Sequence, residues 1–285
     1  MKQADANNNE MSWSIHRVSL AAHNLAESRA YFETRLGLGQ ARAVGDSTIA
    51  FGRGSRGLQV QKPRAAMALR GHDLVVQGGA RHVAIEVADL HLVATRLAKA
   101  SIPYVDALAG DFDGPAIYTQ DPALNVVAFC QAAEAVPQSE TIRSWEKEWG
   151  WGVHHVNLQA GDVRDAVAFY TEIAGMAEGQ WQAPSGRLNF SIDTRELALL
   201  PQGEFNRGIH IIRADAGFAY RNKFPHNPSI GGHPAFFVPD VLAVKARLEA
   251  SGVLVSDAGV YAMAGMHQIY VLDPAANMIE VNQFV

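Results

Sequence analysis

Apolar and polar residues alternate in short runs, and each run is followed by a stretch with helical spacing. The first run, 14–20, has a period of two, and apolar residues then recur every three or four positions over 25–36, before Gly37. A period of two indicates a half-buried strand, and helical spacing indicates an amphipathic helix, which glycine often ends. Further short strand-like runs lie at 47–51 and 57–61. The order is therefore strand, helix and then more strands.

The same order returns three more times along the chain. New first strands are expected at 78–89, 151–158 and 231–240, each followed by an amphipathic helix. The other expected strands lie at 118–131, 188–192, 196–200, 208–213 and 268–282. Units of about 60 to 75 residues that repeat in this way indicate a duplicated architecture. Each has one helix and several strands, too little to cover both faces of its own sheet, so pairing into domains is expected.

The last run, 268–282, has an echo at 116–130, and the two differ at one informative position. They share Tyr, Asp, Pro and Asn, as Tyr118, Asp121, Pro122 and Asn125 in the first copy and Tyr270, Asp273, Pro274 and Asn277 in the second. Where the second copy carries Glu280, the first carries Ala128. An uncompensated carboxylate costs several kcal/mol to bury, so Glu280 needs a metal or another strong partner.

Composition limits the classes of partner. The 285 residues are 48% hydrophobic, and 24 Lys plus Arg stand against 29 Asp plus Glu without blocks of either sign. No nucleic-acid footprint or polybasic membrane patch is present, so a small molecule is the expected partner. Residues 1–11 are expected to form a loose polar tail without a signal core, and no apolar run reaches about 18 residues, which predicts a cytoplasmic protein.

Cysteine usage limits the kinds of metal site. Cys130 is the only cysteine, which excludes an internal disulfide and a site with several thiolates. A metal would therefore be held by His, Asp and Glu.

The repeated units, the His in each first strand and the Asp-Pro-x-x-Asn-x-x-Glu ending resemble the vicinal oxygen chelate superfamily. This superfamily includes glyoxalase I, bleomycin- and fosfomycin-resistance proteins and extradiol ring-cleaving dioxygenases. The length and layout look most like the two-domain type I extradiol dioxygenases. The resemblance implies an α+β fold of four βαβββ units, paired into two domains of open, barrel-like mixed sheets at 12–133 and 150–285. A polar, Trp-containing linker is expected between them.

The resemblance implies a metal site in the second domain at His155, His233 and Glu280. His154 is an alternative ligand, although the alignment of His155 with His16, His82 and His233 favours His155. Two imidazoles and one carboxylate form a facial triad that leaves three positions open on a divalent ion. Such a site favours Fe(II) or Mn(II), while Ni(II), Co(II) and Zn(II) also fit.

His210 occupies the position in the third unit that Glu280 occupies in the fourth. Glyoxalase I-like enzymes usually carry a Glu there, whereas extradiol enzymes carry a His that acts as acid and base, so the resemblance gives His210 that role; a fourth metal ligand is the alternative. Tyr270 matches a tyrosine that contacts substrate, although Tyr118 in the other copy indicates a packing role. A further family histidine would fall near Tyr261, with His267 close by.

In the first half, His16 and His82 resemble ligands, but their companions are Gln59 and Ala128, so that half is expected to be structural. The long connector 214–232 either covers the metal site or only crosses between domains. In the first case it offers Tyr220, Arg221, Lys223 and His226 to an anionic substrate.

The resemblance thus implies an Fe(II) extradiol dioxygenase acting on a catecholic aromatic and O2. A glyoxalase-type metal-dependent isomerase or lyase, and a non-catalytic binding or resistance protein, are the alternatives. A homo-oligomer is compatible with the sequence, which does not determine the oligomeric state.

Overall fold

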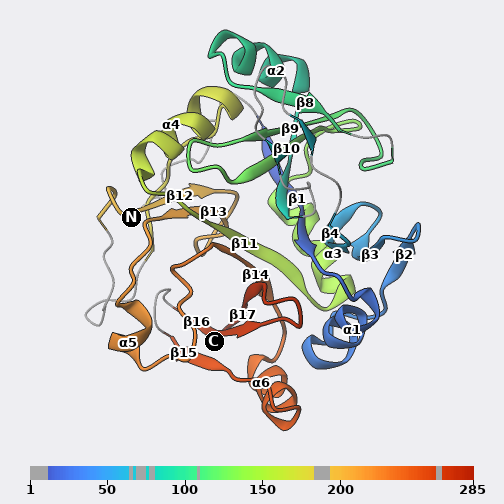
Figure 1. Cartoon of the computed structure of the whole chain (residues 1–285), viewed down its shortest axis with the longest axis vertical. Coiled ribbons are helices and arrows are strands. Elements are labelled where there is room, and N and C mark those ends of the chain that lie inside the picture. Colours follow the sequence, from blue (N-terminus) through green and yellow to red (C-terminus); the bar gives the residue numbers. More distant parts are fainter. Residues whose placement is uncertain are drawn as a thin grey trace.

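The chain folds around two open mixed β-sheets, one in each half (Figure 1). This computed structural model describes residues 12–63, 67–68, 75–76, 81–107, 110–182, 193–260 and 265–285. The predicted tail at 1–11 and the predicted strand at 188–192 lie outside the described residues. The architecture confirms the predicted α+β class and the open sheets.

The first sheet has eight strands in the order β2-β3-β4-β1-β7-β10-β9-β8. Their bounds are β1 Trp13–Ala21, β2 Arg42–Val44, β3 Thr48–Arg53, β4 Arg56–Gln61, β7 His82–Val87, β8 Tyr104–Asp106, β9 Ala116–Gln120 and β10 Val126–Gln131. Two short strands, β5 Met67–Ala68 and β6 Val75–Val76, pair with each other in a separate small sheet. Strand β1 lies parallel to β4 and antiparallel to β7, which joins the first and second units.

The second sheet repeats this order with seven strands, β12-β13-β11-β14-β17-β16-β15. Their bounds are β11 Gly152–Gln159, β12 Leu197–Pro201, β13 Gly208–Ile212, β14 His233–Phe237, β15 Ser256–Gly259, β16 Met266–Leu272 and β17 Met278–Phe284. Strand β11 lies parallel to β13 and antiparallel to β14, as β1 does to its neighbours. The units therefore pair as one-two and three-four. The domain boundaries at 12–133 and 150–285 stay a prediction.

Each unit contributes one helix after its first strand, and the same kind of residue starts all four. The helices are α1 Leu25–Ala30, which continues as the π-helical segment η1 Tyr31–Leu36, then α2 Leu90–Lys99, α4 Val163–Ala174 and α6 Val241–Ala250. The side chains that accept backbone N–H groups at their starts belong to Asn24, Asp89, Asp162 and Asp240. A short carboxylate or amide at this position stabilises a helix because it pairs with an N–H that has no partner within the helix.

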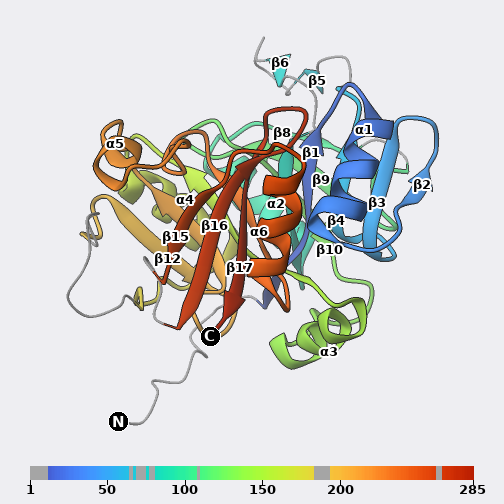
Figure 2. The same cartoon turned by 90° about the horizontal axis from the view of Figure 1, so that it is seen from below.

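The segment predicted as a linker holds a helix, α3 Ser139–Trp149, which lies at the edge of the molecule (Figure 2). Its buried face is only Ile142 and Glu146, which is too sparse to stand out as an apolar period. Arg207 Nη1 donates to Glu146 Oε2 at 2.8 Å, so a buried ion pair ties α3 to the second sheet. A further short helix, α5 Phe218–Asn222, lies in the connector before β14. Among the described residues, no helix is long and apolar enough to cross a bilayer.

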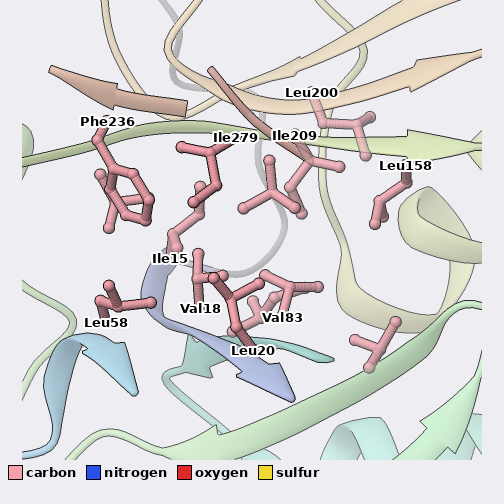
Figure 3. Close-up of a cluster of buried hydrophobic side chains, with 14 of the residues drawn as sticks. Ile15, Val18, Leu20, Leu58, Val83, Leu158, Leu200, Ile209, Phe236 and Ile279 are labelled. Carbon is pink, nitrogen blue, oxygen red and sulfur yellow. The ribbon is translucent and has the colours of Figure 1, made fainter. Parts of the chain in front are cut away.

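The two sheets share one hydrophobic core. Side chains of β1, β4 and β7 meet side chains of β11, β12, β13, β14 and β17 (Figure 3). Those labelled in the figure are Ile15, Val18, Leu20, Leu58 and Val83 from the first half and Leu158, Leu200, Ile209, Phe236 and Ile279 from the second. Burial of apolar surface is the main stabilising contribution to folding, so each sheet depends on the other.

Each copy of the duplicated Asp-Pro-x-x-Asn motif forms a hydrogen bond to the other half of the chain. Asn125 Nδ2 donates to the Gln159 carbonyl at 3.0 Å, and Asn277 Nδ2 donates to the Ala21 carbonyl at 3.0 Å. In both copies the Asp side chain accepts hydrogen bonds from backbone N–H groups of its own turn. Helix contacts repeat the exchange, since α2 lies against α4 and α6 lies against η1. The Asp and Asn that the two copies share are therefore structural in both.

Candidate metal centre

A β-bulge in β11 determines which side chains reach the candidate site. The pairing of β11 with β14 shifts between Val153 and His155, which leaves His154 as the extra residue. A bulge changes the alternation of side chains between the faces of a sheet. As a result Val153 and Val156 both enter the core, whereas His155 and Asn157 line a cavity on the other face.

The same bulge occurs in β1, between Ile15 and Arg17, and it corrects one predicted equivalence. His155 pairs with Ala235, which lies beside Glu280 in β17. Arg17 likewise pairs with Ala84, which lies beside Ala128 in β10. Arg17, and not His16, is therefore the counterpart of His155, and His16 is the counterpart of His154. The alignment on His16 was wrong, although the residue it selected, His155, is the one that faces Glu280.

Three donor atoms converge at the centre of the second sheet. His155 Nε2 lies 3.3 Å and His233 Nε2 lies 3.4 Å from Glu280 Oε2, and ligand atoms of the three residues all lie within 4.8 Å of one another. Donors bound at right angles to one ion, each at about 2.0–2.2 Å, lie about 3 Å apart. All three side chains are buried, and the set of two imidazoles and one carboxylate suits a divalent transition metal. Among the described residues, no other such cluster of three occurs.

The protonation states match those of metal ligands. Burial raises the pKa of Glu280, but the charges and hydrogen bonds of His155 and His233 outweigh burial and hold this pKa well below its usual range. Burial lowers the pKa of His233, against the opposing effect of Glu280. An ionised carboxylate and a neutral imidazole are the forms that bind a cation.

Two of the donors, His155 and Glu280, are also hydrogen-bonded through the atoms that face away from the cluster. His155 Nδ1 lies 2.9 Å from His154 Nδ1. If His155 binds an ion through Nε2, its Nδ1 carries the proton and donates to His154. Glu280 Oε1 accepts from Gln268 Nε2 at 2.8 Å and from Asn282 Nδ2 at 3.0 Å. No pattern in the sequence marks His154, Gln268 or Asn282 for these roles.

His210 lies directly against the donor cluster. Its ring stacks on His155 with centroids 3.9 Å apart, and Trp181 contacts it edge-on at 4.5 Å. His210 Nε2 lies 2.5 Å from the Asn206 carbonyl, which can only accept, so Nε2 carries the proton and Nδ1 is the basic nitrogen. Burial holds the pKa of His210 well below its usual range, so the ring is neutral.

A cavity of about 100 Å³ adjoins these residues. Tyr270, paired across the strands with Glu280, forms part of its wall, and its ring meets that of His233 at 5.5 Å. Other lining residues include Asn157, Trp181, Leu197, Phe218 and Ser229.

The connector reaches the cavity through other residues than those predicted. Tyr220, Arg221, Lys223 and His226 are not among the described lining residues, whereas Asp215, Phe218, Pro228 and Ser229 are. Arg221 pairs with Asp215, and Tyr220 is 90% exposed. His267 is likewise held elsewhere, 2.8 Å from Asp257, and Tyr261 lies outside the described residues.

The equivalent place in the first half is filled differently. Arg17 is fully buried there; its guanidinium lies 3.9 Å over the Phe112 ring and donates to the Asp111 carbonyl at 2.7 Å. His82 and Ala128 stand at the positions of His233 and Glu280. A buried cation at the position of His155, with alanine at the position of Glu280, agrees with a structural first half.

Comparison with known proteins agrees with the fold. Residues 152–281 match the family model described as the Glyoxalase/Bleomycin resistance protein/Dioxygenase superfamily. The matched range contains all three donors, His155, His233 and Glu280, and the predicted resemblance to the vicinal oxygen chelate superfamily is confirmed. No curated protein matches the sequence of the chain.

Solved structures share the fold of both halves. A catechol 2,3-dioxygenase is 15% identical with a TM-score of 0.61, over 94% of this chain and 87% of the other. The Mn(II)-bound glyoxalase from Novosphingobium aromaticivorans is 12% identical with a TM-score of 0.59, over 94% and 81%. A variant of homoprotocatechuate 2,3-dioxygenase from Brevibacterium fuscum is 15% identical with a TM-score of 0.62, over 99% and 74%. At these identities the likeness establishes the fold alone.

Proposed function

We propose that this chain is an Fe(II)-dependent extradiol-type dioxygenase that cleaves the ring of a catecholic aromatic with O2. The observation that carries the proposal is the position of His210. This residue pairs with Asn157 between β13 and β11 in the same way that Glu280 pairs with Ala235 between β17 and β14. The site thus has one carboxylate and, at the equivalent position, a neutral imidazole that can accept a proton.

Each residue would have one task. His155, His233 and Glu280 would hold Fe(II), with Mn(II), Ni(II), Co(II) and Zn(II) as other ions that the donors fit. The bound ion would supply open positions for two reactants and acidify a substrate hydroxyl. His210 would take the hydroxyl proton at Nδ1 and return it later, and Tyr270 would steady a substrate oxygen at the cavity wall.

A glyoxalase-type isomerase or lyase is the second candidate. The fold likeness to the Mn(II)-bound glyoxalase favours it, and His210 or Glu280 would then move a proton on a carbonyl substrate. A non-catalytic binding protein would need neither of these residues, so their presence together argues against that role.

Metal analysis followed by oxygen uptake tests the proposal. After anaerobic loading with Fe(II), the protein should retain one ion per chain and consume O2 with at least one member of a catechol series. Glu280→Ala should lose the ion, whereas His210→Ala should keep it and lose turnover by about 100-fold or more, the contribution typical of a general acid or base. The matched control is exposed His91→Ala, which should change neither property.

Two outcomes would contradict it. If the wild-type protein retained no ion, a metal-dependent reaction would be ruled out. A retained ion without O2 uptake, together with turnover of a hemithioacetal, would favour the glyoxalase-type enzyme.

A further inference from the structure

Two buried amides meet the oxygen of Glu280 that the imidazoles do not face. Gln268 Nε2 and Asn282 Nδ2 both donate to Oε1, at 2.8 and 3.0 Å. The two imidazole nitrogens lie 3.3 and 3.4 Å from Oε2. The carboxylate therefore presents one oxygen to the imidazoles and the other to the amides.

The strands bring the three side chains together on one face. Gln268 and Asn282 are directly opposite each other in β16 and β17, and Glu280 precedes Asn282 by two positions on β17. Residues two apart on a strand point to the same face. All three side chains are at most 1% exposed. The terminal torsion of a free glutamate is broad, so two amides on one oxygen restrict how the carboxylate can turn.

The first half supplies an internal comparison. Its equivalent cross-strand pair is Ala116 and Cys130, and Ala128 stands where Glu280 does. The carboxylate and both amides are thus absent together, although Tyr118, Asp121 and Asn125 keep the rest of the motif. If the amides only packed within the sheet, both halves would be expected to carry them. Their presence only in the half that has Glu280 indicates that their role is linked to this carboxylate.

We propose that Gln268 and Asn282 are positioning residues that keep Glu280 a one-oxygen metal ligand, an inference that rests on the proposed metal site. Hydrogen bonds to an ionised acceptor are stronger than those between neutral groups, so Oε1 is held back from the ion. A carboxylate bound through one oxygen leaves three positions of an octahedral ion open, and one bound through both leaves two. A substrate that binds through two oxygens, together with O2, needs three.

Infrared spectroscopy of the bound carboxylate tests the inference. Gln268→Leu and Asn282→Leu remove the donors at similar side-chain size. The difference spectrum between Co(II)-loaded and metal-free protein isolates the carboxylate that binds. Wild-type protein should show the wide separation of stretching bands that marks one-oxygen binding, and each variant should show the narrow separation of two-oxygen binding while it retains the ion. Oxygen uptake by the Fe(II)-loaded variants should fall about 10- to 100-fold.

Gln59→Leu, which changes a buried amide of the first sheet, should leave the bands unchanged. If the leucine variants fail to fold, Gln268→Met and Asn282→Ala provide the same comparison with less crowding. Variants that retain the ion with wild-type bands and turnover would overturn the role of the amides and leave the metal site standing. A wild-type protein that binds no ion would instead overturn the proposed function, and this inference with it.

Discussion

At the scale of single residues, the imidazole pair His154–His155 is the contact that decides how a donor is oriented. Most metal-binding imidazoles donate their second N–H to a carboxylate or a carbonyl. Here the acceptor is another imidazole, 2.9 Å away and buried. Burial chiefly lowers the pKa of His154, so that ring is neutral and one of its nitrogens can accept.

Replacing His154 should therefore weaken metal binding without removing a ligand. His154→Leu leaves the His155 N–H without an acceptor, and we expect the dissociation constant for Co(II), measured by chelator competition, to rise about 10- to 100-fold. His154→Asn keeps an acceptor oxygen and should recover part of the loss. Equal affinities in all three proteins would show that His154 does not position His155.

The donors, His210 and Tyr270 were predicted because the resemblance assigns roles to strand positions that the repeat makes it possible to locate. The supporting residues His154, Gln268 and Asn282 were not, since an amide or a second imidazole on a strand has no pattern that distinguishes it from packing. Only their hydrogen bonds to a donor reveal the role, and these depend on the register between strands.

At the scale of elements, the repeated strand order was predictable and the bulges were not. Alternation and helical spacing identify each first strand and its helix, and Asn or Asp begins all four helices. The extra residue in β1 and β11 shows only as a spacing of three between apolar residues, from Ile15 to Val18 and from Val153 to Val156. Regular alternation was assumed instead, so His16 was equated with His155. Helix α3 was taken for a linker because its buried face has too few residues.

The turn that carries each Asp-Pro-x-x-Asn motif gives a prediction about the contact between halves. Asn125→Ala and Asn277→Ala each remove a hydrogen bond to the other half and leave a carbonyl oxygen there without this donor. Each should lower the free energy of unfolding by about 1–3 kcal/mol, measured by urea denaturation. Asn222→Ala is the control, because that amide donates within its own helix, and it should cost less. Similar losses in all three would show that the motif does not fasten the halves.

At the scale of the whole molecule, burial of several histidines should make the metal-free protein sensitive to acid. Burial lowers the pKa of His154, His210 and His233 below 6.5, so these rings stay neutral when folded. The unfolded chain takes up protons near pH 6.5, and below that pH it binds more protons than the folded chain does. The free energy of unfolding should therefore fall as the pH is lowered from 7 to 5.5, by up to about 1.4 kcal/mol per pH unit for each proton.

Urea denaturation in the presence of a chelator, at several pH values, measures this slope. His210→Asn should reduce it by about one proton, while His91→Asn at an exposed position should leave it unchanged. A free energy that does not change over this range would show that the three rings are not held neutral.

The buried charge of Arg17 makes the first half independent of any metal ion. This positive charge is covalently attached and survives any chelator, whereas an ion at the second site can be exchanged or lost. Under the proposed function, loss of the ion would then inactivate the second half of the chain without altering the charge in the first. Because both halves share one core, the permanently charged half would act as a template against which the depleted half keeps its shape until an ion returns.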